Sequence, residues 1–282
     1  MANKNLKFSE YPFRVPSEKK IIAKLQGFIE EFKNAEDAKT QINVIKKCNR
    51  YMSDYSTDGS VIYVLYSLDT ENKKYVKAQE KLDEMGPVIG NYSTELTKLI
   101  LNSKFRPELE KEFGSYLFKI YENSVKTFDE KIIPDLIEEN KLVSKYSGIL
   151  GSAQIEFRGE VLNLSQLGKY TVDKDRETRK EAAKAMDKWI GDHDAEIGDI
   201  YDKLVHLRDG IAKKLGFEKY TELGYLRLGR TDYNEEMVRG YRKQIEEDVV
   251  PVCQKLYKAQ MKRIGIKNPG QFFLSFALKS IK

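Results

Sequence analysis

The stretch from Val172 to Arg230 reads VDKDRETRKEAAKAMDKWIGDHDAEIGDIYDKLVHLRDGIAKKLGFEKYTELGYLRLGR. Asp173 can accept hydrogen bonds from the free amides at the start of a helix. The first helical stripe comprises Arg176, Arg179, Ala182, Ala183, Met186 and Trp189. After a break at Gly191, apolar residues recur every three or four positions, at Ile197, Ile200, Tyr201, Leu204, Leu207, Ile211 and Leu215. Gly216 follows where a left-handed residue can end the helix. The stretch therefore predicts an antiparallel pair of amphipathic helices.

The composition is typical of a folded, helical protein with a charged surface. Of the 282 residues, 40% are apolar and 33% are charged, and only 7 are proline. Lysine and arginine exceed aspartate and glutamate by 49 to 44, but the two signs alternate in segments such as EKLDE. No run reaches the density of basic residues that binding to phosphates requires, so we expect no nucleic-acid partner.

The N-terminal segment MANKNLKFSEYPF lacks the apolar core of a signal peptide. The longest apolar run, Val61 to Tyr66, is too short to span a bilayer. Cys48 and Cys253 show no CxxC spacing, which indicates free thiols in a reducing compartment. We therefore expect a cytoplasmic protein without a membrane partner.

The first half of the chain reads as a series of helices, the first capped by Ser17. The sequence STDGS at 56–60 is expected to break the second helix, and Gly86 with Pro87 is expected to end the third. The residues from Val61 to Leu68 fit either a buried strand or the start of a helix. We favour a helix, because an isolated strand would need a partner that the sequence does not offer.

One β signal stands out in the segment SAQIEFRGEVLNL, where Ile155 and Phe157 alternate with polar residues. Arg158 and Gly159 offer a two-residue turn, which would place Ile155 opposite Leu162. The fold class expected is therefore mainly α, a multi-helix array of antiparallel amphipathic helices with one small β-hairpin. We expect a helical region at 1–150, a hairpin and long-helix region at 151–267, and a separate tail at 268–282.

A long final helix is predicted after Thr231 to Asn234, with Pro251 inside it causing a bend and Gly265 ending it. Its expected apolar stripe comprises Met237, Val238, Tyr241, Ile245, Val249, Cys253, Leu256 and Ile264, with Gln260 on the same side.

The sequence offers no convincing metal site. His193 and His206 are the only histidines, and neither has a second histidine four residues further on. Asp199, Asp202, His206 and Asp209 share one helix face, but a solvated face is the simpler interpretation. We therefore expect no cofactor bound by this chain and no catalytic residue within it.

The candidate substrate-binding residues are Tyr225, Arg227, Arg230 and Tyr233, at the exit of the second helix. Arginines beside aromatic rings suit recognition of a peptide carboxylate or backbone. The alternative is that these residues join helices by stacking and capping.

Several segments together resemble one known family. They are SLDTENKKY, MGPVIGNYSTELTKLIL, SKFRPELEKEFG, YENSVKTF, EENKLVSKYSGILGSAQIEFRGEVLNLSQL and the helical stretch quoted first. From about Asp69 to Gly265 the chain is similar to the M3-family oligoendopeptidases of the PepF type. The resemblance implies the helical N-terminal half of a zinc metallopeptidase, which forms one wall of a channel for short peptides.

In that family an HExxH helix supplies two zinc ligands and the general base, but this sequence contains no such motif. The likeness also ends near Asn268, so we expect a chain that stops before the zinc helix and is inactive alone. It should associate with itself through apolar surface near its end. The alternatives are an inactive helical module that binds peptides or a protein, and an independent helical scaffold.

Overall fold

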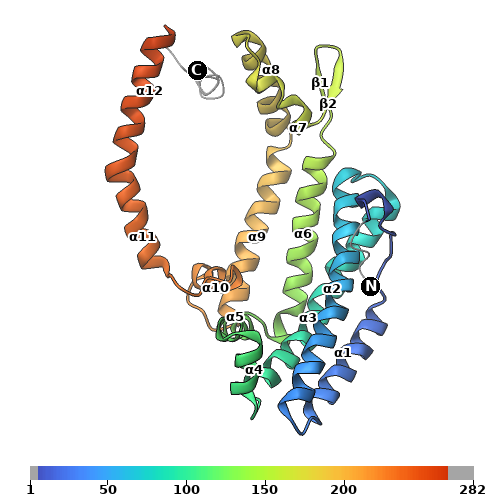
Figure 1. Cartoon of the computed structure of the whole chain (residues 1–282). Coiled ribbons are helices and arrows are strands. Elements are labelled where there is room, and N and C mark those ends of the chain that lie inside the picture. Colours follow the sequence, from blue (N-terminus) through green and yellow to red (C-terminus); the bar gives the residue numbers. More distant parts are fainter. Residues whose placement is uncertain (1–5, 266–282) are drawn as a thin grey trace. The chain divides into compact units, whose positions relative to one another are not determined.

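The computed structural model describes residues 6–265, which divide between two compact units. Of the described residues, the first unit contains 6–148 and 200–231, and the second contains 149–199 and 232–265. The chain first passes from one unit to the other between Gly148 and Ile149, near the predicted boundary at Gly151. Nothing in the sequence predicted that residues 200–231 would belong to the first unit. The expected tail at 268–282 lies outside the described residues. The described residues are mainly helical with a single two-stranded hairpin, as predicted (Figure 1).

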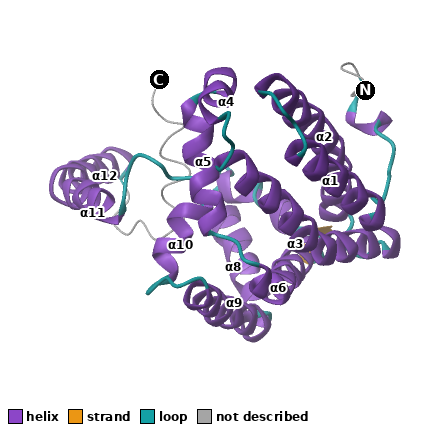
Figure 2. Cartoon of the chain, turned by 90° about the horizontal axis from the view of Figure 1, so that it is seen from below, coloured by secondary structure: helices purple, strands orange, loops and turns teal. Residues whose placement is uncertain are grey.

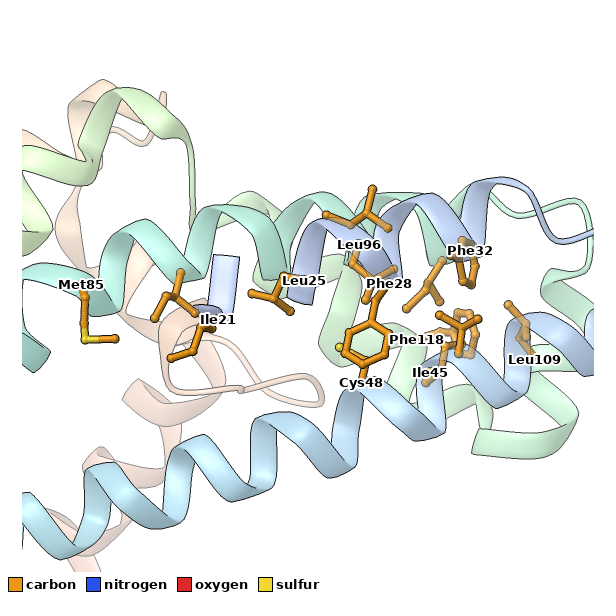
Figure 3. Packing of buried hydrophobic residues seen from close by; sticks show 14 residues of the cluster. Ile21, Leu25, Phe28, Phe32, Ile45, Cys48, Met85, Leu96, Leu109 and Phe118 are labelled. Atoms are coloured by element: carbon orange, nitrogen blue, oxygen red, sulfur yellow. The ribbon is translucent and has the colours of Figure 1, made fainter. Parts of the chain in front are cut away.

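Three long helices build the core of the first unit: α1 (Glu18–Lys33), α2 (Ala38–Leu68) and α3 (Lys73–Leu101). These three helices lie side by side, as Figure 2 shows. The shorter helices α4 (Arg106–Phe113) and α5 (Ser115–Lys126) pack against α2 and α3. Leu25, Ile45 and Phe118 are almost completely buried in the cluster that these helices form (Figure 3). Each such side chain contributes roughly 1.5–3 kcal/mol through burial. The sequence's apolar stripes therefore meet in one cluster.

Helix α2 runs without interruption through the segment 56–60, so the expected break there is wrong. The hydroxyl of Thr57 donates to the carbonyl of Ser53 at 2.9 Å, and that of Ser60 donates to Ser56 at 2.8 Å. Hydroxyls that bond to the preceding turn fit within a helix. The helix predicted for the residues after 60 is confirmed.

Helix α3 likewise continues through Gly86 and Pro87, so the expected end there is wrong. Proline has no amide hydrogen, which leaves the carbonyl of Asp83, four residues earlier, without its helical donor. The side-chain amide of Asn140 donates to that carbonyl at 3.0 Å. Asn140 lies on α6 (Ile133–Gly151), which follows the short turn η2 (Glu130–Ile132). A residue distant in sequence thus supplies the missing hydrogen bond.

The first unit also receives most of α9 (Asp194–Lys214) and α10 (Tyr220–Arg227). Ile211 and Leu223 are fully buried in a cluster with Ile132. Gly216 has φ +87°, which confirms the left-handed end predicted after the helix.

In the second unit, β1 (Ile155–Phe157) and β2 (Glu160–Leu162) form an antiparallel hairpin. Ile155 pairs with Leu162, as predicted, and the turn residues Arg158 and Gly159 both have positive φ, 53° and 82°. Such a turn matches the natural twist of a hairpin. The hairpin's apolar face packs with α7 (Leu164–Leu167) and α8 (Arg176–Asp192).

Ala182 of α8 is buried in the cluster of the hairpin, and Ile211 of α9 is buried in the cluster with Ile132 and Leu223. The start of α8 differs from the prediction. Its N-cap is Asp175, which accepts from the amide of Thr178 at 2.8 Å. Asp173 instead ends the short turn η3 (Tyr170–Val172).

The last helical segment comprises α11 (Glu235–Gln244), the π-helical turn η4 (Ile245–Val249) and α12 (Val250–Ile264). Asn234 caps it, accepting from the amide of Met237 at 3.0 Å, and Gly265 ends it with φ +71°. Pro251 lies in the first turn after the π-helical turn, so the wider turn accommodates its missing amide. No described residue of this segment is buried.

Candidate functional site

The candidate residues lie on α10 and in the loop that follows it. Leu223, fully buried, anchors α10 in the first unit, where it packs against α5. Tyr225, Arg227 and Arg230 therefore belong to the first unit. Tyr233 belongs to the second unit and is 47% exposed.

Arg227 forms a charged network with Glu139 on α6. Its Nη2 lies 2.8 Å from Glu139 Oε2, and its Nη1 lies 3.3 Å from Oε1. Arg208 on α9 donates through Nε to the same Oε1 at 2.7 Å. The side chain of Glu139 is only 9% exposed, so two guanidinium groups compensate one buried carboxylate. Sequence reasoning missed Glu139, which stands beside the exposed Glu138 with no local signal to separate them.

The charge state of Glu139 follows from two opposing effects. Burial alone would raise the pKa of its carboxyl, but hydrogen bonds from Arg227 and Arg208 outweigh it and hold the pKa below its ordinary value. The same carboxylate raises the pKa of Arg227 against the effect of burial. The network is therefore fully ionised at neutral pH, and the guanidinium of Arg227 already has an anionic partner.

Tyr225 and Arg230 lie together. The guanidinium carbon of Arg230 lies 4.1 Å from the centre of the Tyr225 ring, within range of a cation–π interaction. The carbonyl of Arg230 accepts from the side-chain amide of Asn123 at 3.3 Å. Next to it, the hydroxyl of Thr231 donates to that of Tyr116 at 3.3 Å. Both contacts fasten the loop to α5.

The two histidines have local roles. The ring of His193 stacks on Trp189 with 4.1 Å between centres, and its Nδ1 lies 2.8 Å from the Trp189 carbonyl. The ring of His206 is exposed, with its Nδ1 3.5 Å from Asp202 Oδ2, and Asp209 pairs with Lys213 at 2.6 Å. Over the described part of the chain, no three His, Cys, Asp or Glu side chains gather closely enough to hold a metal ion. Nor does a helix there combine the length and apolar character needed to cross a membrane.

Comparison with known proteins gives these elements a family context. Residues 8–128, which include α1 to α5, match the family described as the peptidase M3 N-terminal domain. No curated protein matches the sequence. This part of the chain thus carries the N-terminal domain of an M3 peptidase.

Solved structures extend the likeness over nearly the whole chain. Pz peptidase A, determined with an inhibitor, shares 37% sequence identity with a TM-score of 0.93 over 96% of this chain and 48% of its own. A protein assigned as oligoendopeptidase F from Bacillus anthracis strain Ames shares 38% identity with the same TM-score, over 97% of this chain and 50% of its own. The chain is therefore homologous to the N-terminal half of the M3-family oligoendopeptidases. It spans about half the length of these relatives.

Proposed function

We propose that this chain acts as the N-terminal half of a zinc metalloendopeptidase that hydrolyses short oligopeptides, and that it does not cleave peptides alone. The observation that carries the proposal is the fold match at 37% identity over 96% of this chain, with only 48% of the relative covered. The chain's role is to supply a helical wall that holds peptides, while the chemistry needs groups absent from its sequence.

The residue types present support this division of labour. A zinc peptidase needs metal ligands and a general base beside them. Within residues 6–265, each of the two histidines contacts the preceding helical turn. No three potential metal ligands lie close together in these residues. Zinc is accordingly a cofactor of the complete enzyme, and this chain should not hold it.

For the peptide itself, the candidates are Tyr225, Arg227, Arg230 and Tyr233. Tyr225 with Arg230 presents a ring and a cation together, which suits a peptide carboxylate. Arg227 fits a supporting role better, because Glu139 occupies its guanidinium. We place the working enzyme in the cytoplasm, on its two free thiols.

The test is to purify the 282-residue chain and measure bound zinc and cleavage of a quenched fluorogenic oligopeptide. We expect no stoichiometric zinc and no turnover, with or without added zinc. Adding the C-terminal half of the B. anthracis relative should restore chelator-sensitive turnover. That half alone, and a mixture containing heat-denatured chain, are the controls. Chelator-sensitive turnover by the pure chain would overturn the proposal.

A second function, as an inactive module that binds a protein, is favoured by α11 and α12. Their apolar side chains are exposed: Met237 by 58%, Tyr241 by 64% and Leu256 by 63%. Exposed apolar side chains that recur along one helical segment can mark an interaction surface. On this view the chain also associates with itself when no partner covers that surface.

A further inference from the structure

A cavity of about 810 Å³ opens in the first unit between α2, α3 and α6, and its lining shares no residue with the candidate site. This volume falls within the range of about 300–1,000 Å³ typical of small-molecule sites. Tyr66 and Val76 contribute apolar surface to it. The remaining lining is polar: Lys77, Gln79, Glu80, Lys81, Asp83, Glu84, Lys141, Ser144 and Lys145.

A buried carboxylate lines this cavity. Asp83 is only 6% exposed, and it accepts hydrogen bonds from Gln79 Nε2 at 2.9 Å and from Ser144 Oγ at 2.6 Å. Both donors are neutral. Among residues 6–265 no lysine, arginine or histidine forms an ion pair with it, which is unusual for a buried charge.

A second acceptor beside Asp83 has no donor at all. Gln79 is 9% exposed, and its Oε1 is buried without a hydrogen-bond partner among the described residues. Buried polar atoms are normally satisfied, so an unpaired one indicates a donor from outside the chain. Asp83 therefore lacks a positively charged partner, and the Oε1 of Gln79 lacks a hydrogen-bond donor. One cationic donor could supply both.

The exposed lining carries more cations than anions, with Lys77, Lys81, Lys141 and Lys145 against Glu80 and Glu84. Lys141 pairs with Glu84 at 2.8 Å, but neither Lys77 nor Lys81 forms an ion pair within the described part of the chain. Two lysines available in this exposed lining would attract an anionic group. The cavity thus combines acceptors in its buried part with cations in its exposed part.

We propose that this cavity binds a small zwitterion, a free amino acid or a dipeptide. Its ammonium group donates to Asp83 and to the Oε1 of Gln79, and its carboxylate meets Lys77 and Lys81. An ammonium group has three donors, enough for both acceptors. A ligand with only one of the two charges would leave either the carboxylate or the lysines uncompensated. The inference does not depend on peptidase activity.

The first test is a set of ligands titrated calorimetrically into the unaltered chain. Leucine and leucyl-leucine carry both charges, N-acetyl-leucine lacks the ammonium group, and leucinamide lacks the carboxylate. We expect both zwitterions to bind at least about tenfold more tightly than either blocked compound, because charged hydrogen bonds are lost. Equal affinity for leucine and N-acetyl-leucine, or no binding of either zwitterion up to about 10 mM, would refute the proposal.

A matched pair of variants gives an independent test. Asp83→Asn removes the charge in the cavity, whereas Asp58→Asn removes a partly buried carboxylate outside it. Burial raises the pKa of Asp83 against the hydrogen bonds of Ser144 and Gln79, so the fold does not need the charge. We expect about tenfold weaker leucine binding for Asp83→Asn and none of this loss for Asp58→Asn. A folded Asp83→Asn variant with unchanged affinity would contradict the assignment, and circular dichroism checks the fold.

Discussion

Glu139 fixes one residue of the candidate site, Arg227, because its carboxylate binds Arg227 and Arg208 from two different helices. Glu139→Gln leaves both guanidinium groups without a counter-charge. We expect a loss of about 3 kcal/mol in the free energy of unfolding, the usual scale for a broken buried ion pair. Urea denaturation of the purified chain measures it. Glu138→Gln, at the exposed neighbouring position, is the control and should change stability little.

Glu139 also predicts how the stability of the chain depends on pH. The folded-state pKa of Glu139 is lowered, so its ionised form contributes stability above the unfolded pKa, about 4.3. That contribution is lost as pH falls through the lower folded pKa. The stability difference between the native chain and Glu139→Gln should therefore be full at pH 7 and shrink below about pH 4. A difference that grows with acidification would show that the carboxylate is not held in its ionised form.

At the scale of the element, α3 is continuous because Asn140 replaces the amide that Pro87 lacks. Asn140→Ala should cost roughly 1–3 kcal/mol, since the Asp83 carbonyl becomes a buried acceptor without a donor. In the Pro87→Ala background the restored amide can serve that carbonyl, so the same substitution should cost clearly less. Denaturation of all four proteins in this double-mutant cycle gives the coupling energy. Additive losses would mean that the two residues act independently.

The same elements show what the sequence could and could not predict. The hairpin register and the glycines that end helices at Gly216 and Gly265 were predictable, because each depends on neighbouring residues. The continuity of α3 was not, since its decisive hydrogen bond comes from a residue 57 positions away. In the candidate site, the sequence singled out Arg227 among arginines and aromatic residues, but its partner Glu139 lies 88 positions away. Local patterns cannot identify such pairs, and the substrate-binding role and the domain division at Gly151 stay predictions.

For the whole molecule, we predict that the exposed apolar side chains of α11 and α12 let the chain associate with itself. Leu256 and Met237 are more than half exposed there, and burying such side chains against another molecule is favourable by roughly 1.5–3 kcal/mol each. We expect the mass in solution, measured by light scattering, to rise with concentration. The double variant Met237→Lys with Leu256→Lys should suppress that rise.

The double variant Tyr63→Lys with Leu68→Lys adds the same two charges and provides the matched control, because these residues are 55% and 75% exposed on α2, an element of the first unit. If the exposed side chains of α11 and α12 cause association, the control should associate as the native chain does. Equal suppression by both changes would instead assign the effect to added positive charge, since the chain already carries a formal charge of +5. If adding the C-terminal half of the relative also lowers self-association, both partners compete for one surface. A monomer at every concentration would show that exposed apolar side chains spread along a single helical segment are too few to hold two copies together.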